Sequence, residues 1–365
     1  MRVSLTLLAS ASVVSAWTEL LHKTIMHKNI DAIVSPGAYT SHMHTFFGSD
    51  AITNAMPTTE DLQQGCYSGS NPNDFSAYYL IGIPTLYHVD GDKFTEVTLF
   101  TFGTYYTTAY AEIPIPKNFS MISGKASAKT QAEADHPENG LQWYCEESPG
   151  VLEPDAAKMP TKACQQHLRF SLLFPNCVDP NNISIYGFSD SSTNKCPEGM
   201  KRMPQLRYSA RYDTKKAAPN GWNGPAPFQL SCSDTPGDGY CFHGDFINGW
   251  YEDAALDMLI SDGNGRDNGR FISGSHGTSA IADNCNPTDR DPENGTSDYW
   301  TSLEMKANGG IAAPGPVAST PSITSSTMAT SVTAPSANET GQKRRIGQKS
   351  KNFARLRQRL SADSL

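Results

Sequence analysis

The alternation of apolar and polar residues predicts short β-strands along most of the chain. Residues 94–102 alternate strictly, and they follow an apolar and aromatic run at 79–89 and the turn pair Asp90-Gly91. Two such runs joined by a turn dipeptide are typical of a β-hairpin. By the same pattern we expect further short strands at 105–113, 141–145, 168–174 and 205–212.

One segment instead has the spacing of an amphipathic helix. In Glu252–Ile260 the apolar residues Ala255, Leu256, Leu259 and Ile260 fall on one face. Proline and glycine interrupt nearly every gap between the expected strands, and other helical patterns are few. We therefore expect a mainly β protein, a β-sandwich or jelly-roll-like single domain with few short helices.

The first residues have the pattern of a secretory signal peptide. Arg2 precedes a short apolar run, and the small residues Val14 and Ala16 stand where a signal peptidase would cut. The run is too short to span a bilayer, and no other stretch is long and apolar enough. Residues 1–16 are therefore predicted to be removed, which indicates a secreted, extracellular or cell-wall-associated protein.

Composition divides the rest of the chain into three parts. Residues 17–310 are predicted to be globular, 311–342 form a linker rich in Ser, Thr and Pro, and 343–365 form a basic disordered tail. The net charge is −8. No basic patch marks the globular part, so we do not expect nucleic acid as a partner.

The eight cysteines all lie in the globular part. An even number in an exported chain predicts up to four disulfides, and the short spacing favours a bridge between Cys232 and Cys241. No C-x-x-C pair indicates a zinc ribbon or a redox site. Four N-x-S/T sequons are consistent with a glycoprotein and begin at Asn118, Asn182, Asn294 and Asn338.

The first candidate site is the run Ser41–Thr45, which contains His42 and His44. In a strand, residues two apart point to the same face, so both imidazoles could converge on one metal ion or one anionic substrate. The alternative is a pair of histidines on an ordinary polar surface.

The second candidate site is the run His243–Trp250. In an extended backbone His243 and Asp245 would point the same way. Asp245 could hold the tautomer of a catalytic histidine, ligate a metal or act as an acid or base. The alternative is a turn in which Asp245 accepts hydrogen bonds from backbone amides.

Two single carboxylates lie near these motifs. Asp31 or Asp74 could supply a partner for acid–base work on a glycoside. Aspartate near Pro, Gly or Ser more often caps a turn, and this structural interpretation is favoured for both residues.

These motifs together resemble a fungal secreted family known as "domain of unknown function nineteen ninety-six". The resemblance covers about residues 28–262. It is carried in order by Asp31–Gly37, Ser41–Thr45, Asp74–Tyr79, Pro84–Tyr87, Pro116–Gly124, Phe174–Cys177, Cys196–Glu198, Met203–Leu206 and His243–Trp250. It implies an extracellular protein associated with the cell wall or with glycans, and it implies no particular activity.

The chain departs from this family pattern in two places. Val178–Pro180 stands where the family carries Trp-Asp-Gly, and Ile183–Lys195 contains no histidine where the family carries a second histidine cluster. If that cluster completes an active site, this chain is a divergent or inactive member.

Three hypotheses of function follow. The first is a polysaccharide-active hydrolase or lyase, with His243, Asp245, Asp74 and Asp31 as catalytic candidates and His42 and His44 binding substrate or metal. The second is a non-catalytic protein that binds cell wall or glycan. The third is an extracellular metal-binding protein in which His42, His44 and His243 hold a divalent ion, zinc or copper. The common serine hydrolase, NTPase and zincin motifs are absent.

Overall fold

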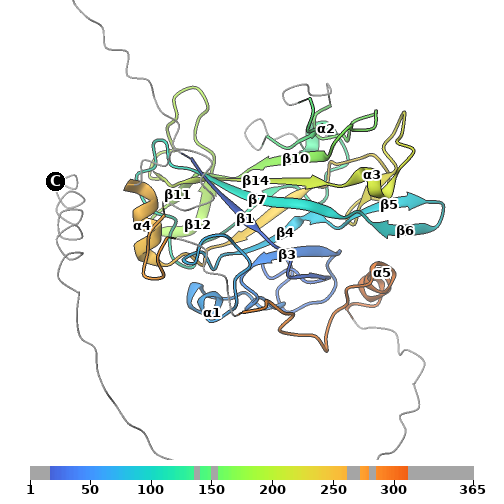
Figure 1. The fold of residues 1–365 in the computed structure, drawn as a ribbon. Coiled ribbons are helices and arrows are strands. Elements are labelled where there is room, and N and C mark those ends of the chain that lie inside the picture. The colour runs from blue at the N-terminus through green and yellow to red at the C-terminus, as the bar shows by residue number, and fades with distance from the viewer. Residues whose placement is uncertain (1–16, 135–139, 149–154, 261–271, 279–284, 311–365) are drawn as a thin grey trace, which may run out of the picture. The chain divides into compact units, whose positions relative to one another are not determined.

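The computed structural model describes residues 17–134, 140–148, 155–260, 272–278 and 285–310. Within these ranges the chain is mainly β, as predicted (Figure 1). The strands form two five-stranded and two three-stranded sheets, in which the neighbouring strands are antiparallel. The predicted signal peptide at 1–16, the linker at 311–342 and the basic tail at 343–365 lie outside the described residues.

Two five-stranded sheets carry most of the structure. In spatial order, the first sheet consists of β1 (Trp17–His22), β7 (Leu99–Thr107), β14 (Gln205–Tyr212), β10 (Leu168–Leu173) and β9 (Gln142–Cys145). The second sheet consists of β2 (Met26–Lys28), β3 (His44–Gly48), β4 (Ala77–Pro84), β16 (His243–Ile247) and β8 (Ser120–Gly124).

Smaller elements surround these two sheets. One three-stranded sheet contains β12 (Asn182–Gly187), β11 (Cys177–Asp179) and β13 (Lys201–Arg202), and the other contains β15 (Phe228–Leu230), β5 (Leu86–Asp90) and β6 (Lys93–Glu96). The helices are α1 (Thr59–Gln63), α2 (Gln131–Ala134), α3 (Thr214–Ala217), α4 (Glu252–Ile260) and α5 (Tyr299–Ala307). Figure 1 shows α4 at one end of the molecule and α5 at the other.

The two five-stranded sheets pack face to face around one apolar core. The ring of Phe47 on β3 lies 4.2 Å from that of Phe102 on β7, measured between centroids. Phe246 on β16 belongs to the same buried cluster. Because side chains alternate along a strand, their neighbours on β3 and β16 point to the opposite face of the second sheet, which we call its outer face. A separate cluster that includes Phe46 and Ile247 covers part of that face.

The predicted hairpin and helix are present, with one shifted face. β5 and β6 pair around Asp90-Gly91, and α4 spans the predicted residues. Among the side chains of α4 that the structure describes, those of Ala254, Ala255 and Met258 are buried. The buried face of the helix is therefore rotated away from Leu256 and Leu259, which are only partly buried, and toward Ala254, which packs in the core.

Three predicted strands are divided or shortened. The run 79–89 breaks into β4 and β5 after Pro84, whose missing N–H cannot continue a ladder. The run 94–102 breaks at Val97, and its two parts join different sheets. The strand expected at 105–113 is the end of β7, which stops at Thr107 before a turn in which Tyr110 has a φ of 64°.

Four disulfides join all eight cysteines, as predicted. The pairs are Cys66–Cys285, Cys145–Cys164, Cys177–Cys196 and Cys232–Cys241. The short bridge favoured by spacing is therefore confirmed. Within the described residues, no helix is both long enough and apolar enough to cross a membrane.

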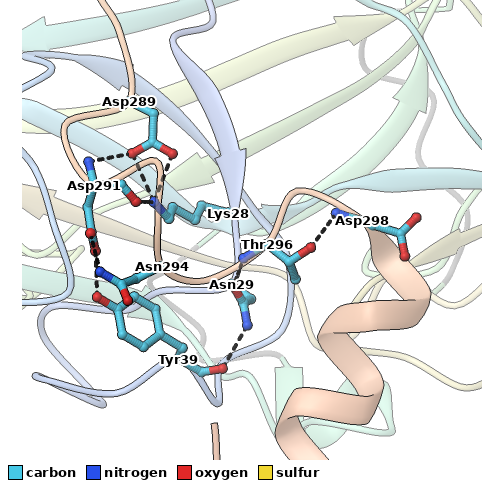
Figure 2. A network of polar contacts seen from close by, with 8 residues as sticks. All are labelled: Lys28, Asn29, Tyr39, Asp289, Asp291, Asn294, Thr296 and Asp298. Carbon is cyan, nitrogen blue, oxygen red and sulfur yellow. Dashed lines mark hydrogen bonds and ion pairs between the residues drawn. The ribbon is translucent and has the colours of Figure 1, made fainter. Parts of the chain in front are cut away.

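The segment 285–310 is fastened to the N-terminal part of the fold (Figure 2). Lys28 is only 2% exposed, and its ammonium lies 2.8 and 2.9 Å from the two carboxylate oxygens of Asp289. The Asn29 side chain donates to the Tyr39 carbonyl and accepts from the Thr296 amide, both at 2.7 Å. These contacts fix the loop 29–43, which leads directly into β3.

Candidate metal centre

The two histidines of Ser41–Thr45 lie together, although only one of them is in a strand. β3 begins at His44, and His42 precedes the strand in the loop. Their ring centroids are 4.3 Å apart in an edge-on arrangement. The expected shared face is thus achieved by the turn of the loop into β3 rather than by strand alternation alone.

His243 joins this pair from a distant part of the sequence. It is the first residue of β16, and its ring centroid lies 5.3 Å from that of His42. One ring nitrogen from each of the three histidines lies within 4.8 Å of the other two. The sequence predicted two separate motifs, and the second sheet brings them together as one group, which we call the histidine cluster (His42, His44 and His243).

The main chain orients two of these rings. Nδ1 of His44 lies 2.5 Å from the carbonyl oxygen of Ile30, and Nδ1 of His243 lies 2.8 Å from that of Cys241. A carbonyl can only accept, so each Nδ1 carries the hydrogen, and each Nε2 in a neutral ring presents a lone pair. Asp245 was expected to hold the His243 tautomer, but the carbonyl of Cys241 occupies that position.

The Nε2 atoms of all three histidines are buried without a hydrogen-bond partner among the described residues. A buried polar atom that is left unpaired costs about 1–3 kcal/mol, so such atoms rarely occur together unless a ligand satisfies them. Three in one cluster are therefore a strong indication of a binding site.

Burial also keeps the cluster uncharged. It lowers the pKa of His44 to about 3 and the pKa of His243 to about 4. The pKa of His42 is lowered well below its usual value, first by burial and then by the charges of His44, His243 and Lys306. At neutral pH all three are neutral imidazoles, which is the form that binds metal ions.

Asp245 lies on the outer face beside the cluster. It stands two residues after His243 in β16, so its side chain projects from the same face. The residue is fully buried, and neither carboxylate oxygen has a hydrogen-bond partner among the described residues. Burial, with a further contribution from the charge of Asp31, raises the pKa of Asp245 well above its usual value.

Asp31 has the contacts of a turn residue. Its Oδ1 accepts hydrogen bonds from the amides of Ile33 at 3.0 Å and Val34 at 2.7 Å. These bonds lower its pKa, but burial outweighs them and the pKa is raised. Asp31 follows Ile30, whose carbonyl holds His44, so the turn positions a ring of the cluster.

Asp74 lies in a different network. Its carboxylate accepts from the hydroxyl of Tyr78 and, at 3.1 Å, from the amide of Ser76. The Tyr78 hydroxyl is 2.6 Å from that of Tyr106, which also accepts from the indole of Trp250 at 3.2 Å. Burial raises the pKa of Asp74 to about 7. No contact joins this network to the histidine cluster in the described residues.

Three groups at the site were not found from the sequence. The carbonyls of Ile30 and Cys241 are main-chain atoms, which no side-chain pattern marks. Lys306 on α5 affects His42 electrostatically across more than 250 residues of chain. The Cys232–Cys241 bridge could have given a hint, because it fixes the chain just before His243.

A second group with metal-ligand spacing is formed by Cys145, Glu147 and Cys164. Both sulfurs belong to one disulfide, so neither is available as a thiolate. Among the described residues, the histidine cluster is thus the group whose donor atoms are free to bind an ion.

Comparison with known proteins places the chain in a family without assigning it an activity. No curated protein and no solved structure matches it. The family model described as "Domain of unknown function (DUF1996)" matches residues 31–250, which is more than half of the chain and includes the whole histidine cluster. The chain therefore belongs to the DUF1996 family.

Proposed function

We propose that the protein is an extracellular metal-binding protein in which His42, His44 and His243 hold one divalent ion, zinc or copper. Two observations carry the proposal: one ring nitrogen of each histidine lies within 4.8 Å of the others, and all three Nε2 atoms are buried with no hydrogen-bond partner among the described residues. Imidazole nitrogens are good ligands for both metals. Carbonyls that fix the opposite ring nitrogen are typical of histidines that ligate metals.

The dimensions of the cluster fit such an ion after a small adjustment. Zinc–nitrogen bonds are about 2.0–2.1 Å long, so two ligand nitrogens can be at most roughly 4 Å apart. The ligand atoms lie within 4.8 Å of one another. Ring movements of less than about 1 Å would therefore bring all three into the coordination sphere.

Charged groups near the histidine cluster act on a cation in both directions. Lys306 lies close enough to His42 to oppose positive charge. Asp245 and Asp31 interact with each other and supply carboxylates on the same side of the sheet. Asp245 is the stronger candidate for direct contact with the ion or with its ligand, because Asp31 already accepts two amide hydrogen bonds.

A metal-dependent enzyme is a second candidate function. Three histidines leave a coordination position open, and a bound zinc or copper ion would supply Lewis-acid chemistry there. The Asp245 carboxyl, which has no hydrogen-bond partner among the described residues, projects from the same face and could move a proton there. We propose a hydrolase or lyase acting on an extracellular polysaccharide, with a non-catalytic glycan-binding protein as its alternative.

Four disulfides support an extracellular location, because disulfides form and persist outside the reducing cytosol. The apolar start of the chain with a cleavable pattern supports export as well. Secretion is thus part of the proposal and is tested by finding the mature protein in the culture medium with a new N-terminus at Trp17.

The metal proposal is tested by elemental analysis of the purified full chain, followed by zinc and copper titrations of the metal-free protein. We expect one ion per chain. The His44→Ala variant should bind the metal at least about 100-fold more weakly. Losing a residue that only hydrogen-bonds to a metal ligand costs about 10–100-fold in affinity, and losing the ligand itself should cost more. His276→Ala is the matched control, because that histidine is exposed and its ring lies against Phe75 and Tyr251.

Two results would overturn the metal proposal. One is a metal-free protein that takes up neither ion at millimolar concentration. The other is equal metal affinity in the His44→Ala and His276→Ala variants. The enzymatic candidate is tested separately, by product release from a panel of insoluble glucans, chitin and plant polysaccharides. Retention without product favours the binding alternative, and unchanged release by Asp245→Asn would exclude Asp245 from the chemistry.

A further inference from the structure

We propose that a pocket on the other side of β3 binds a single ring of a neutral sugar. The pocket has a volume of about 380 Å³, within the range of known small-molecule sites. Four threonines, Thr24, Thr45, Thr85 and Thr98, contribute to its wall, and we call it the threonine pocket. It goes beyond the metal proposal and does not depend on a bound ion.

The threonine pocket lies where the two large sheets and the β5–β6 hairpin meet. Thr45 is on β3, Tyr212 ends β14, and Leu99 begins β7. Thr45 follows His44 in the strand, so their side chains point to opposite faces of the second sheet. The pocket and the histidine cluster are thus separate sites that share one strand.

An unpartnered buried hydroxyl on one of the residues that line the pocket, Tyr212, is the main indication of a ligand. Tyr212 is 1% exposed, and its hydroxyl has no hydrogen-bond partner among the described residues. Burial and the nearby Glu96 carboxylate raise the pKa of Tyr212, so the hydroxyl stays protonated and can donate. A buried donor of this kind is favourable only when an incoming acceptor meets it.

A fixed histidine–carboxylate pair forms another wall. Nδ1 of His27 lies 3.0 Å from the Thr45 hydroxyl, and its Nε2 lies 3.3 Å from the Glu96 carboxylate. Both ring nitrogens are therefore engaged within the protein. Glu96 is half-exposed and keeps acceptor positions free for a donor in the pocket.

The chemistry of the wall selects the class of ligand. Hydroxyl groups from threonine and tyrosine both donate and accept, as do those of a sugar, and the Glu96 carboxylate accepts. Leu86 and Val97 add buried apolar surface that suits the C–H face of a sugar ring. The Glu96 carboxylate would repel an anion. A cation would have to compete for that carboxylate with His27, which already contacts it.

The test titrates the full-length protein with glucose, mannose and N-acetylglucosamine, followed by ligand-observed NMR, with glucuronate and glucosamine as charged counterparts. We expect saturable binding of at least one neutral sugar and weaker binding of both charged ones. Tyr212→Phe should weaken binding about tenfold, the effect of losing one good hydrogen bond. Its melting temperature should not fall, because the hydroxyl has no partner to lose.

Thr95→Val is the matched control, because Thr95 is exposed on the same hairpin but does not line the pocket. The His44→Ala variant should bind sugar as the wild type does, which separates this proposal from the metal proposal. The inference is overturned if none of the neutral sugars binds saturably, or if glucuronate binds best. It is also overturned if Tyr212→Phe and Glu96→Gln both bind the neutral sugar as tightly as Thr95→Val does.

Discussion

Two buried polar groups lie on the second sheet, and they differ in how completely they are satisfied. In the Asp74 network, the carboxylate, two tyrosine hydroxyls and an indole N–H all find partners inside the protein. In the histidine cluster, three Nε2 atoms and the neighbouring carboxylate of Asp245 find none within the part of the chain that the structure describes. Both groups contain residues that the sequence marked as catalytic candidates.

The difference separates structural from functional polar groups. A closed network rigidifies the core and needs nothing from outside. An open one carries a desolvation cost that only a ligand offsets. On this criterion Asp74 has the contacts of a structural residue, whereas the histidine cluster has those of the metal site that we propose. Four measurements would break or sharpen the distinction.

The largest effect is expected from the pH dependence of stability at Asp74. Its folded pKa is raised to about 7 by burial, from an ordinary value near 3.8. Between about pH 4 and pH 7 the folded chain keeps a proton that the unfolded chain loses, so stability falls as the pH rises through this window and then levels off. The upper limit of this loss is on the order of 4 kcal/mol.

Asp74→Asn removes the titration, and urea denaturation from pH 4 to pH 8 compares the two proteins. As the pH rises from 4 to 7, the wild type should lose free energy of unfolding relative to Asp74→Asn. Parallel stability curves would show that Asp74 does not titrate as stated. Zinc affinity should be the same in both, because the network does not contact the histidine cluster.

Adding metal should produce the next effect. An ion that binds only the folded state at 100 times its Kd raises the free energy of unfolding by about 2.7 kcal/mol. We expect this gain in the wild type and in Asp74→Asn, and its absence in His44→Ala. A chelator should reverse it. Thermal unfolding at fixed zinc concentrations measures the shift, and an equal gain in His44→Ala would place the ion elsewhere.

A smaller loss is expected from opening the closed network. Tyr106→Phe removes the group that contacts the Tyr78 hydroxyl and accepts from the Trp250 indole. An unsatisfied buried donor costs about 1–3 kcal/mol, so we expect a destabilisation of about 2 kcal/mol with unchanged metal affinity. Chemical denaturation and a zinc titration test the two parts. Lost metal binding in the folded variant would mean that the two groups are coupled.

The strands and the helix could be predicted where local pattern and tertiary packing agree. β14 and α4 occupy the expected residues, although the face of α4 that packs on the core is shifted from the predicted one. The run 79–89 was predicted as one strand because an apolar pattern does not reveal that Pro84 ends pairing and that the next residues enter another sheet. Local alternation reports which residues are buried, not which sheet buries them.

The candidate site was predictable in its side chains but not in its assembly. His42, His44 and His243 were identified by their spacing, yet the contact between the two motifs depends on β16 lying near β3 across β4. The orienting carbonyls of Ile30 and Cys241 are set by backbone geometry, which carries no side-chain signature. The threonine pocket was missed for the same reason, since its wall comes from several distant strands.

The smallest expected effect concerns Asp245, and its sign distinguishes the two kinds of polar group most directly. In a closed network, replacing a carboxylate destabilises the fold because its partners are left unpaired. The side chain of Asp245 has no such partners in the described ranges, and in the metal-free protein its burial only costs free energy. Asp245→Asn should therefore be neutral or more stable by about 1 kcal/mol at pH 7, since the raised pKa of Asp245 costs the fold stability as the pH rises and the amide does not titrate.

The same substitution should weaken metal binding or the reaction that depends on it, because the carboxyl is then serving the ion or its ligand. Denaturation of the metal-free variant and a zinc titration measure the two effects, with Asp74→Asn as the matched carboxylate from the closed network. A clear loss of stability in metal-free Asp245→Asn would mean that this carboxylate belongs to the fold. The open part of the site would then be reduced to the three histidines.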